Sequence, residues 1–424
     1  MSSFSGQVRR RRVFYIPGYD PIHPRRYREL YRKEGAAQAA VSGYEIALSP
    51  KQGPKQDKGR YGWHVEALMD GQAVQADVEV LVWSDIVRDS MAQGIVATYL
   101  QLIRTAWTYI ASGALFRLMR LRKGPVIAAL YPVGFLIVQL ALAVLAGIVV
   151  LAAFTRGWEM VLSPEGAWFP PYFALSVYIG LALGVVAGVM VLRWFKARDG
   201  KFFAYYLMHD YAYTARLRGA NPPELEARLA EFAAEIAGAL ADDVDEVLVV
   251  GHSSGAHLAV SVLADLIRAG RVPKDGPALS FLSLGQVVPM VSFLPDARRL
   301  RADLAYLGAR DELTWVDVTA PGDGCAFALC DPVSVSGVAT ADKRWPLVIS
   351  AAFTQTLSPE RWRELRWRFF RLHFQYMCAF DRPGDYDYFR ITAGPLTLGA
   401  RYAGRVPSKS RIEKPVNTHV SVTP

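Results

Sequence analysis

The chain has 424 residues, of which 52% are apolar, 12% aromatic and 21% charged. The aromatic content excludes intrinsic disorder for most of the chain, and three cysteines exclude a disulfide scaffold and favour a reducing compartment. The 48 basic and 39 acidic residues give a net charge of +9, which indicates an anionic surface nearby, either a membrane or nucleic acid.

The first 90 residues are predicted to open an α/β domain. A basic run, Arg9 to Arg12, precedes a short apolar strand from Val13 to Ile16, which ends at Pro17-Gly18. Four apolar residues are too few for a signal peptide, and none is expected here. The periodicity predicts a helix over residues 25–40 and strands over residues 44–48, 63–69 and 78–83.

Two uncharged stretches, residues 126–154 and 167–192, are each long enough to cross a bilayer as a helix. Four basic residues lie just before the first stretch and four just after the second, whereas residues 155–166 hold one arginine and two glutamates. The positive-inside rule therefore predicts that both ends are cytoplasmic and the short connection is outside. Because the positive charge gathers beside these stretches, membrane lipids are the expected partner and nucleic acid is not.

Two further features refine this membrane segment. Gly180, Gly184 and Gly188 repeat every four residues, which allows another helix, most simply the first span, to approach closely. Residues 95–121 mix apolar residues with arginines and are expected to form a helix on the cytoplasmic membrane face, or else a soluble helix of the domain.

After the membrane segment, strands and helices alternate again. A helix is expected from Asn221, strands over residues 247–250, 279–284 and 313–318, and a helix over residues 255–269. Continuous apolar strands separated by helices predict a mostly parallel sheet with helices on both faces. Residues 1–90 and 206–403 would thus form one α/β domain, interrupted by a membrane insertion at residues 91–205 and followed by a flexible polar tail at residues 404–424.

The segment Gly251-His252-Ser253-Ser254-Gly255 lies between a predicted strand and a predicted helix, the setting of a nucleophile elbow. A sharp turn there would lift the Ser253 hydroxyl above the sheet edge. Gly251 and Gly255 are expected because a Cβ at either position would collide with a neighbouring element. The backbone N–H of Ser254, at the positive end of the helix, would stabilise an oxyanion.

With Ala256-His257-Leu258-Ala259 following, this segment resembles the lipase and esterase members of the α/β-hydrolase superfamily. The resemblance covers residues 13–20 and about 220–390. It implies a serine nucleophile, a carboxylate after a later strand, a histidine later still, and a second oxyanion donor after an early strand. Pro17-Gly18-Tyr19-Asp20 is similar to that early loop and makes the Tyr19 N–H the donor; proline stands where the family often has histidine, and an ordinary strand-end turn is the alternative.

The resemblance also suggests the acid. Asp323 follows the strand 313–318. Active sites of parallel α/β sheets lie at the carboxyl ends of the strands, so an acid at this position can reach the site. Asp331 is the alternative acid. Asp317 lies inside the strand and is expected to be a structural residue whose side chain is hydrogen-bonded within the fold.

Only two histidines follow these acids. His419 lies in the polar tail, so His373, which is followed by a tyrosine as in the family, is the expected base. A structural histidine in an aromatic layer is the alternative. His252 and His257 lie near Ser253 in the sequence and are expected to be structural.

These residues predict a membrane-anchored serine hydrolase. His373 would deprotonate Ser253, Asp323 would orient the imidazole, and an acyl-enzyme would form and be hydrolysed. No metal or cofactor is expected, because the cysteines show no zinc spacing and Cys325 and Cys330 have no histidine nearby in the sequence.

The substrate is expected to be an ester or thioester. Because the protein is expected at the membrane, acyl lipids are possible substrates of this class. A basic-aromatic cluster precedes His373 and consists of Trp362, Arg363, Trp367, Arg368 and Arg371. It could contact lipid headgroups, and a solvated amphipathic helix is the alternative. A catalytically inactive scaffold or lipid-binding protein is the second class of function. Transport is disfavoured, because the two stretches contain no ionisable residue. The oligomeric state is open.

Overall fold

The computed structural model describes residues 6–51, 61–162 and 170–423. They divide into two compact units. The first, called here the α/β unit, comprises the described residues of Met1–Asp89, Thr108–Val126 and Thr214–Pro424. The second, called here the helical unit, comprises those of Ser90–Trp107 and Ile127–Tyr213.

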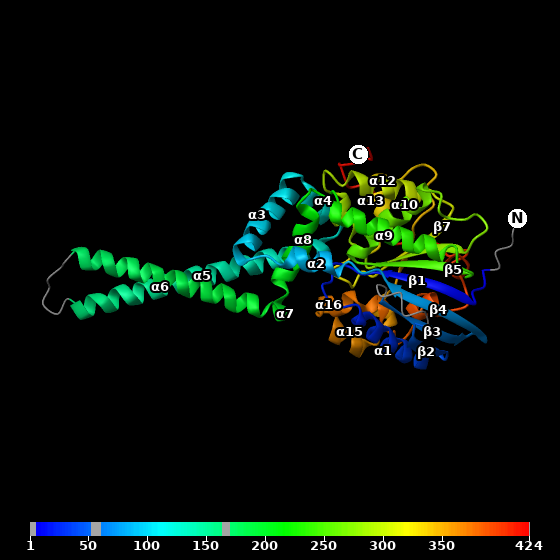
Figure 1. Ribbon diagram of the computed structural model, residues 1–424, viewed down its shortest axis with the longest axis horizontal. Coiled ribbons are helices and arrows are strands. Elements are labelled where there is room, and N and C mark those ends of the chain that lie inside the picture. The colour runs from blue at the N-terminus through cyan, green and yellow to red at the C-terminus, as the bar shows by residue number, and fades with distance from the viewer. Residues whose placement is uncertain (1–5, 52–60, 163–169, 424) are drawn as a thin grey trace. The chain divides into compact units, whose positions relative to one another are not determined.

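Among the described residues of the α/β unit, eight strands form one sheet in the order β2-β3-β4-β1-β5-β6-β7-β8 (Figure 1). Their bounds are β1 Arg10–Ile16, β2 Glu45–Pro50, β3 Tyr61–Met69, β4 Gln72–Val80, β5 Glu246–His252, β6 Ala278–Leu284, β7 Leu313–Thr319 and β8 Leu347–Ser350. β3 is antiparallel to β2 and β4, and all other neighbours are parallel. The predicted α/β class with a mostly parallel sheet is confirmed; the sequence patterns missed β8.

Helices cover both faces of this sheet (Figure 1). On one face lie α1 (Arg25–Ser42) and α17 (Tyr388–Ala393), and on the other α9 (Pro223–Ala239), α10 (Ser254–Arg268) and α12 (Arg298–Gly308). The first face holds a large aromatic core in which the ring of Tyr31 contacts Trp63 and Phe389. The remaining short helices of this unit are α2 Ser84–Met91, α11 Val288–Ser292, α13 Pro332–Val335, α14 Phe353–Thr356, α15 Pro359–Leu365, α16 Phe369–His373, η1 Gln375–Met377 and α18 Leu398–Arg401.

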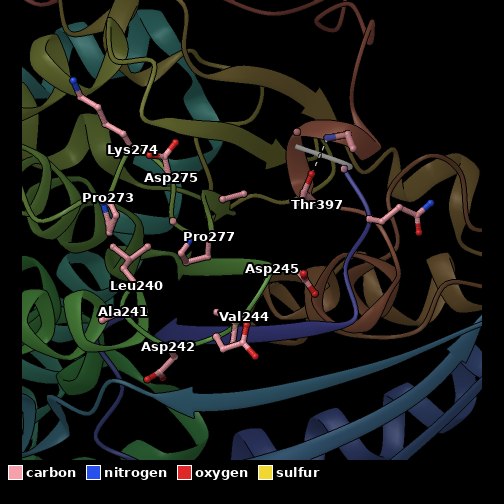
Figure 2. Close-up of a pocket in the computed structure, with 17 residues that line it drawn as sticks. Leu240, Ala241, Asp242, Val244, Asp245, Pro273, Lys274, Asp275, Pro277 and Thr397 are labelled. Atoms are coloured by element: carbon pink, nitrogen blue, oxygen red, sulfur yellow. Dashed lines mark hydrogen bonds between the residues drawn. The ribbon is translucent and has the colours of Figure 1, made fainter. Parts of the chain in front are cut away.

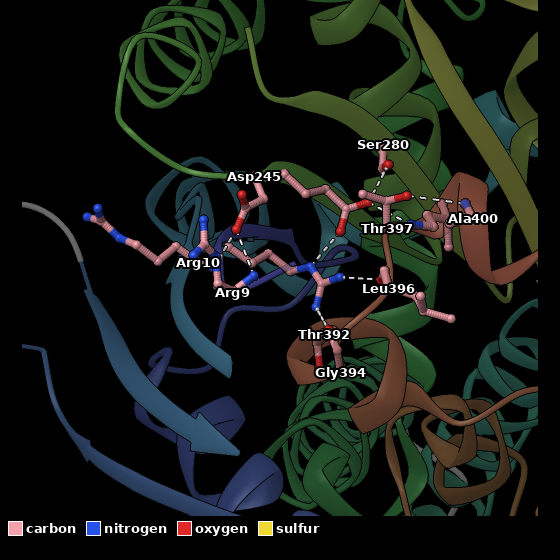
Figure 3. Close-up of polar contacts among 12 residues, drawn as sticks. Arg9, Arg10, Asp245, Ser280, Thr392, Gly394, Leu396, Thr397 and Ala400 are labelled. Carbon is pink, nitrogen blue, oxygen red and sulfur yellow. Dashed lines mark hydrogen bonds and ion pairs between the residues drawn. The ribbon is translucent and has the colours of Figure 1, made fainter. Parts of the chain in front are cut away.

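A buried ion pair ties the amino ends of two central strands to a late segment of the chain. Arg11 Nε donates to Glu246 Oε2 at 2.5 Å, and both side chains are fully buried. The same guanidinium donates to the carbonyl oxygens of Gly394 and Leu396, and Glu246 also accepts from Ser280 Oγ (Figure 3). The Arg11 guanidinium therefore bridges β1, β5 and the segment before α18.

The C-terminal tail differs from the flexible segment predicted for residues 404–424. Ile412 exchanges backbone hydrogen bonds with the 329–331 segment. The buried Asn417 side chain donates to the Ser292 carbonyl at 3.0 Å, and the buried guanidinium of Arg301 donates to the Ser421 carbonyl at 2.9 Å. Polar composition predicts a loose tail, but buried hydrogen bonds hold it in both directions: the Asn417 amide donates to a carbonyl outside the tail, and the Ser421 carbonyl accepts from Arg301.

The helical unit contains two helices that are long and apolar enough to cross a membrane. They are α5 (Lys123–Leu162) and α6 (Pro170–Ala197), and the qualifying stretches span 39 and 25 residues. Large apolar side chains along both helices are exposed, among them Leu145 and Val186 at 55% each. Residues 163–169, which include part of the predicted outer connection, lie outside the described residues.

The glycine repeat lies where α5 and α6 pack together. A Cβ added at Gly184 would lie 2.7 Å from the Gly147 carbonyl oxygen, and one at Gly188 would lie 3.1 Å from that of Ala143. The two backbones therefore approach within a distance that only small residues permit. This confirms the prediction that the repeat packs against the first apolar helix.

The predicted interfacial helix over residues 95–121 is wrong as a single element. It is broken into α3 (Ile95–Ala111) and α4 (Ala114–Leu121), with Gly113 at φ +69° between them. The boundary between the two units falls within α3. The last residues of α3 and all of α4 belong to the α/β unit. Tyr109 of α3 donates from its Oη to the Met290 carbonyl at 2.9 Å, and Leu118 of α4 is buried.

The insertion at 91–205 therefore needs corrected bounds. The other helices of the helical unit are α7 (Asp199–Phe202) and α8 (Ala204–Ala215), and α8 places Met208 in a small core with Leu102 and Leu136. α8 thus extends that unit to Tyr213.

Candidate active site

Ser253 occupies a strained turn between β5 and α10. Its backbone has φ +56° and ψ −122°, a region that side chains other than glycine rarely adopt. A Cβ at Gly255 would lie 2.1 Å from the Ile16 carbonyl oxygen, and one at Gly251 would lie 2.7 Å from that of Gly255. Both glycines are thus required by close backbone packing, and the turn has the geometry expected of a nucleophile elbow.

The loop after β1 lies directly against this serine. A Cβ at Gly18 would lie 3.0 Å from Ser253 Cβ and 3.4 Å from its Oγ. Tyr19 is buried, and Trp83 Nε1 holds the loop by donating to the Pro17 carbonyl at 3.0 Å. The two predicted oxyanion donors, the backbone N–H groups of Tyr19 and Ser254, belong to segments that flank Ser253.

Ser254 is the first residue of α10. Backbone N–H groups in a first helical turn have no intrahelical acceptor. The backbone N–H of Ser254 is therefore available to an oxyanion, and the positive end of the α10 helix favours a negative charge at this position.

His373 and Asp323 meet beyond the same edge of the sheet. His373 ends α16, Asp323 follows β7, and their Nδ1 and Oδ2 atoms are 2.7 Å apart with both side chains buried. Burial alone would raise the pKa of Asp323, but the His373 charge and the hydrogen bonds from His373, Cys325 and Tyr376 outweigh it and lower that pKa. Asp323 is therefore a carboxylate that can orient the imidazole.

Tyr376 completes the support of Asp323. Its Oη donates to Asp323 Oδ2 at 3.0 Å and accepts the Ala320 backbone N–H at 3.0 Å. Burial and the neighbouring carboxylate raise its pKa well above the usual range, so the hydroxyl stays a donor. This role was not predicted from the sequence, where the only signal for it is the position of Tyr376, three residues after His373.

The imidazole lies close to the serine turn. A Cβ at Gly285, which has φ +52°, would be 3.0 Å from His373 Cε1, and the preceding residue Leu284 accepts the Ser253 backbone N–H at 2.9 Å. In the described part of the chain, no hydrogen bond joins Ser253 Oγ to His373. Such bonds are often long without ligand and tighten when substrate binds.

His252 supports the backbone of His373. Its Nε2 lies 3.0 Å from the His373 carbonyl oxygen, and the two rings are 4.7 Å apart. Burial and the charge of His373 lower the pKa of His252 to about 3, so its ring is neutral and donates from Nε2. This agrees with its expected structural role.

The two other acids considered do not reach the histidine. Asp331 caps α13 by accepting from Val333 and Ser334, and its second oxygen lies 2.6 Å from Lys343 Nζ. Asp317 accepts a hydrogen bond from Ser283 Oγ inside the sheet, and burial raises its pKa to about 8. Asp323 alone of the three is bonded to a histidine.

His419 is also remote from the serine. Its Nε2 lies 3.3 Å from the Ser112 carbonyl oxygen.

His257 is buried in α10, and burial lowers its pKa to about 4. The unfolded chain binds a proton there below about pH 6.5, whereas the folded chain does not until about pH 4. Stability is therefore complete above pH 6.5 and falls between these values by about 1.4 kcal/mol per pH unit from this residue. His257→Gln should flatten urea-unfolding stability across that window relative to wild type. Equal pH slopes for the two proteins would contradict this assignment.

Cys325 corrects the expectation that the cysteines have no histidine partner. The ligand atoms of Asp323, Cys325 and His373 all lie within 4.8 Å of one another. The Cys325 backbone N–H also donates to Asp323 Oδ1 at 2.9 Å, in a turn that places its side chain beside the acid. Sequence spacing missed this contact because 48 residues separate Cys325 from His373.

The basic-aromatic cluster packs on the loop that carries Asp323. A Cβ at Gly322 would lie 2.6 Å from the Trp362 ring. Glu364 accepts from Arg368 at 3.0 Å and is 3.2 Å from Arg371, so these two charges are already paired within the cluster.

None of these residues lines a separate pocket of about 1090 Å³. Figure 2 shows the residues that line it. It is lined by residues 240–245 and 273–278, which precede β5 and β6, whereas Ser253 follows β5. The pocket is therefore at the amino ends of the parallel strands, opposite the serine. Its acids are partly neutralised, because Asp242 pairs with Arg12 and Asp243 with Arg10.

The comparisons with known proteins identify no relative. No protein-family model matches this chain, and neither a curated protein nor a solved structure matches it.

Proposed function

We propose that this protein is a serine hydrolase of the α/β-hydrolase type that cleaves an ester or thioester through an acyl-enzyme. The observation that carries the proposal is the 2.7 Å contact between His373 Nδ1 and a buried Asp323 carboxylate, at the strand-end edge where Ser253 is strained into a turn. Support comes also from the order of these residues along the chain, which is the order of the lipases and esterases that the elbow segment resembles.

Each residue has one step in this mechanism. With Nδ1–H donated to Asp323, the second ring nitrogen of His373 accepts the Ser253 proton as Oγ attacks the acyl carbonyl. The N–H groups of Tyr19 and Ser254 stabilise the oxyanion. The ring then protonates the leaving group, and water attacks the acyl-enzyme by the same route in reverse.

Labelling with a fluorescent alkyl phosphonate tests the proposal. Wild-type chain in detergent should be labelled on Ser253, and Ser253→Ala should lose the label completely. Ser254→Ala, which keeps the backbone N–H, is the matched control and should still be labelled. A folded wild-type chain that takes up no phosphonate would favour the inactive scaffold or lipid-binding function instead.

The membrane location is part of the proposal. Two apolar helices of sufficient length and an exposed stripe on α3, in which Val96, Ile103 and Trp107 are each more than 60% exposed, support anchoring to a bilayer. An anchored hydrolase has local access to acyl lipids, which makes lipid esters and thioesters the substrate class we propose.

The orientation can be tested separately from catalysis. A reporter inserted within residues 155–166 should read as external, whereas reporters at either terminus should read as cytoplasmic, because basic residues gather at the start of α5 and at the end of α6. Alkaline phosphatase and fluorescent-protein fusions give opposite signals on the two sides. A cytoplasmic signal from the 155–166 insertion would exclude the two-span orientation.

A further inference from the structure

The cluster of Asp323, Cys325 and His373 has the composition of a metal site. A carboxylate oxygen, a thiol sulfur and an imidazole nitrogen lie within 4.8 Å of one another, and the acid and the histidine are almost fully buried. Zn²⁺ binds these three atom types at about 2.0–2.3 Å, which places tetrahedral ligands roughly 3.5 Å apart. Movements of about 1 Å would close the cluster around an ion.

The cysteine is unnecessary for the hydrolytic mechanism. The Cys325 backbone N–H supports Asp323, and any residue except proline would keep this contact. The half-buried thiol nevertheless lies beside the acid–histidine pair. Of the other cysteines, Cys330 is buried and Cys378 contacts the Phe374 carbonyl, and Cys325 alone among them belongs to a three-ligand cluster in the described part of the chain.

We propose that Asp323, Cys325 and His373 bind a thiophilic divalent cation such as Zn²⁺, and that its binding switches the hydrolase off. Solvent would complete the coordination. The inhibition rests on the proposed function, whereas the metal binding does not.

The proton balance explains the inhibition. The metal replaces the thiol proton of Cys325, and one proton leaves to solvent. Because Asp323 faces Nδ1 of His373, the ion takes that nitrogen, and the ring proton moves to the other nitrogen. The ring then presents a donor toward Ser253 and cannot accept its proton. The site is inactive until the ion dissociates.

Metal binding is measured first, on the full chain in detergent. Competition with a chromogenic zinc chelator should give one Zn²⁺ per chain, and Co²⁺ should give a thiolate charge-transfer band. Cys325→Ser should weaken binding by roughly 100-fold or more and abolish the band, whereas Cys378→Ser should change neither. Zn²⁺ should also protect Cys325 of the wild type from alkylation, as read by mass spectrometry, without protecting Cys378.

Undiminished Zn²⁺ affinity in Cys325→Ser, or a wild-type chain without the charge-transfer band and the protection, would overturn the site.

Inhibition is measured second, as the rate of phosphonate labelling with and without saturating Zn²⁺. The rate of each variant is compared with its own metal-free rate. Wild type and Cys378→Ser should slow at least 10-fold, and Cys325→Ser should not. Acceleration by Zn²⁺ would overturn the switch. Absence of labelling without metal would instead refute the proposed function and leave the binding result standing.

Discussion

Asp323→Asn is expected to slow the acylation of Ser253 by about 10⁴-fold while leaving the fold intact. The amide keeps the shape of the carboxyl group, but it can present an N–H to His373 and favour the wrong tautomer. It also fails to stabilise the imidazolium that forms when the serine loses its proton. The labelling rate with an alkyl phosphonate, normalised to the folded fraction, measures the effect.

Asp331→Asn is the comparison that separates the two acids. Asn can still cap α13, and the ion pair with Lys343 is the contact it loses. We therefore expect a moderate loss of stability and a labelling rate within a few-fold of wild type. A large rate loss in Asp331→Asn together with a small one in Asp323→Asn would reverse the assignment. Tyr376→Phe, which removes one donor to Asp323, should fall between them.

Arg11→Met is expected to lower the free energy of unfolding of the α/β unit by about 3–5 kcal/mol. The substitution leaves Glu246 fully buried without its cation and leaves the carbonyl oxygens of Gly394 and Leu396 without the guanidinium donor. Urea unfolding followed by the fluorescence of the buried tryptophans Trp63 and Trp315 would report this unit.

Two variants distinguish the buried pair from a general effect of lost charge. Arg10→Met removes an arginine whose side chain is 57% exposed and which pairs with a 99% exposed Asp243, so its effect should stay below about 1 kcal/mol. Arg11→Met combined with Glu246→Gln should recover part of the loss, because the carboxylate charge is removed while an acceptor for Ser280 remains. Equal destabilisation by Arg10→Met and Arg11→Met would refute the role of burial.

Local patterns were sufficient where neighbouring residues decide the structure. The apolar run before Gly251 and the small residues after Ser253 predict a strand, a sharp turn and a helix. These predictions hold because hydrophobic periodicity and side-chain size determine the local conformation within a few residues. The two uncharged stretches predict long apolar helices for the same reason, and the glycine repeat predicts their close packing. The choice of His373 over His419 came from order along the chain and from the resemblance.

Contacts between distant residues required the tertiary structure. Asp323 and Asp331 both follow β7, and only the fold shows that one meets His373 while the other caps a helix. The polar tail reads as loose, yet Asn417 is bound because its buried side-chain amide donates to the Ser292 carbonyl oxygen. The serine turn, the two long apolar helices and most of the parallel strands were thus determined by local sequence, whereas β8 and the break between α3 and α4 were not. The partners of each buried polar group, including Cys325 beside the histidine, were decided by packing, since hydrogen bonds are satisfied across the fold and not along the chain.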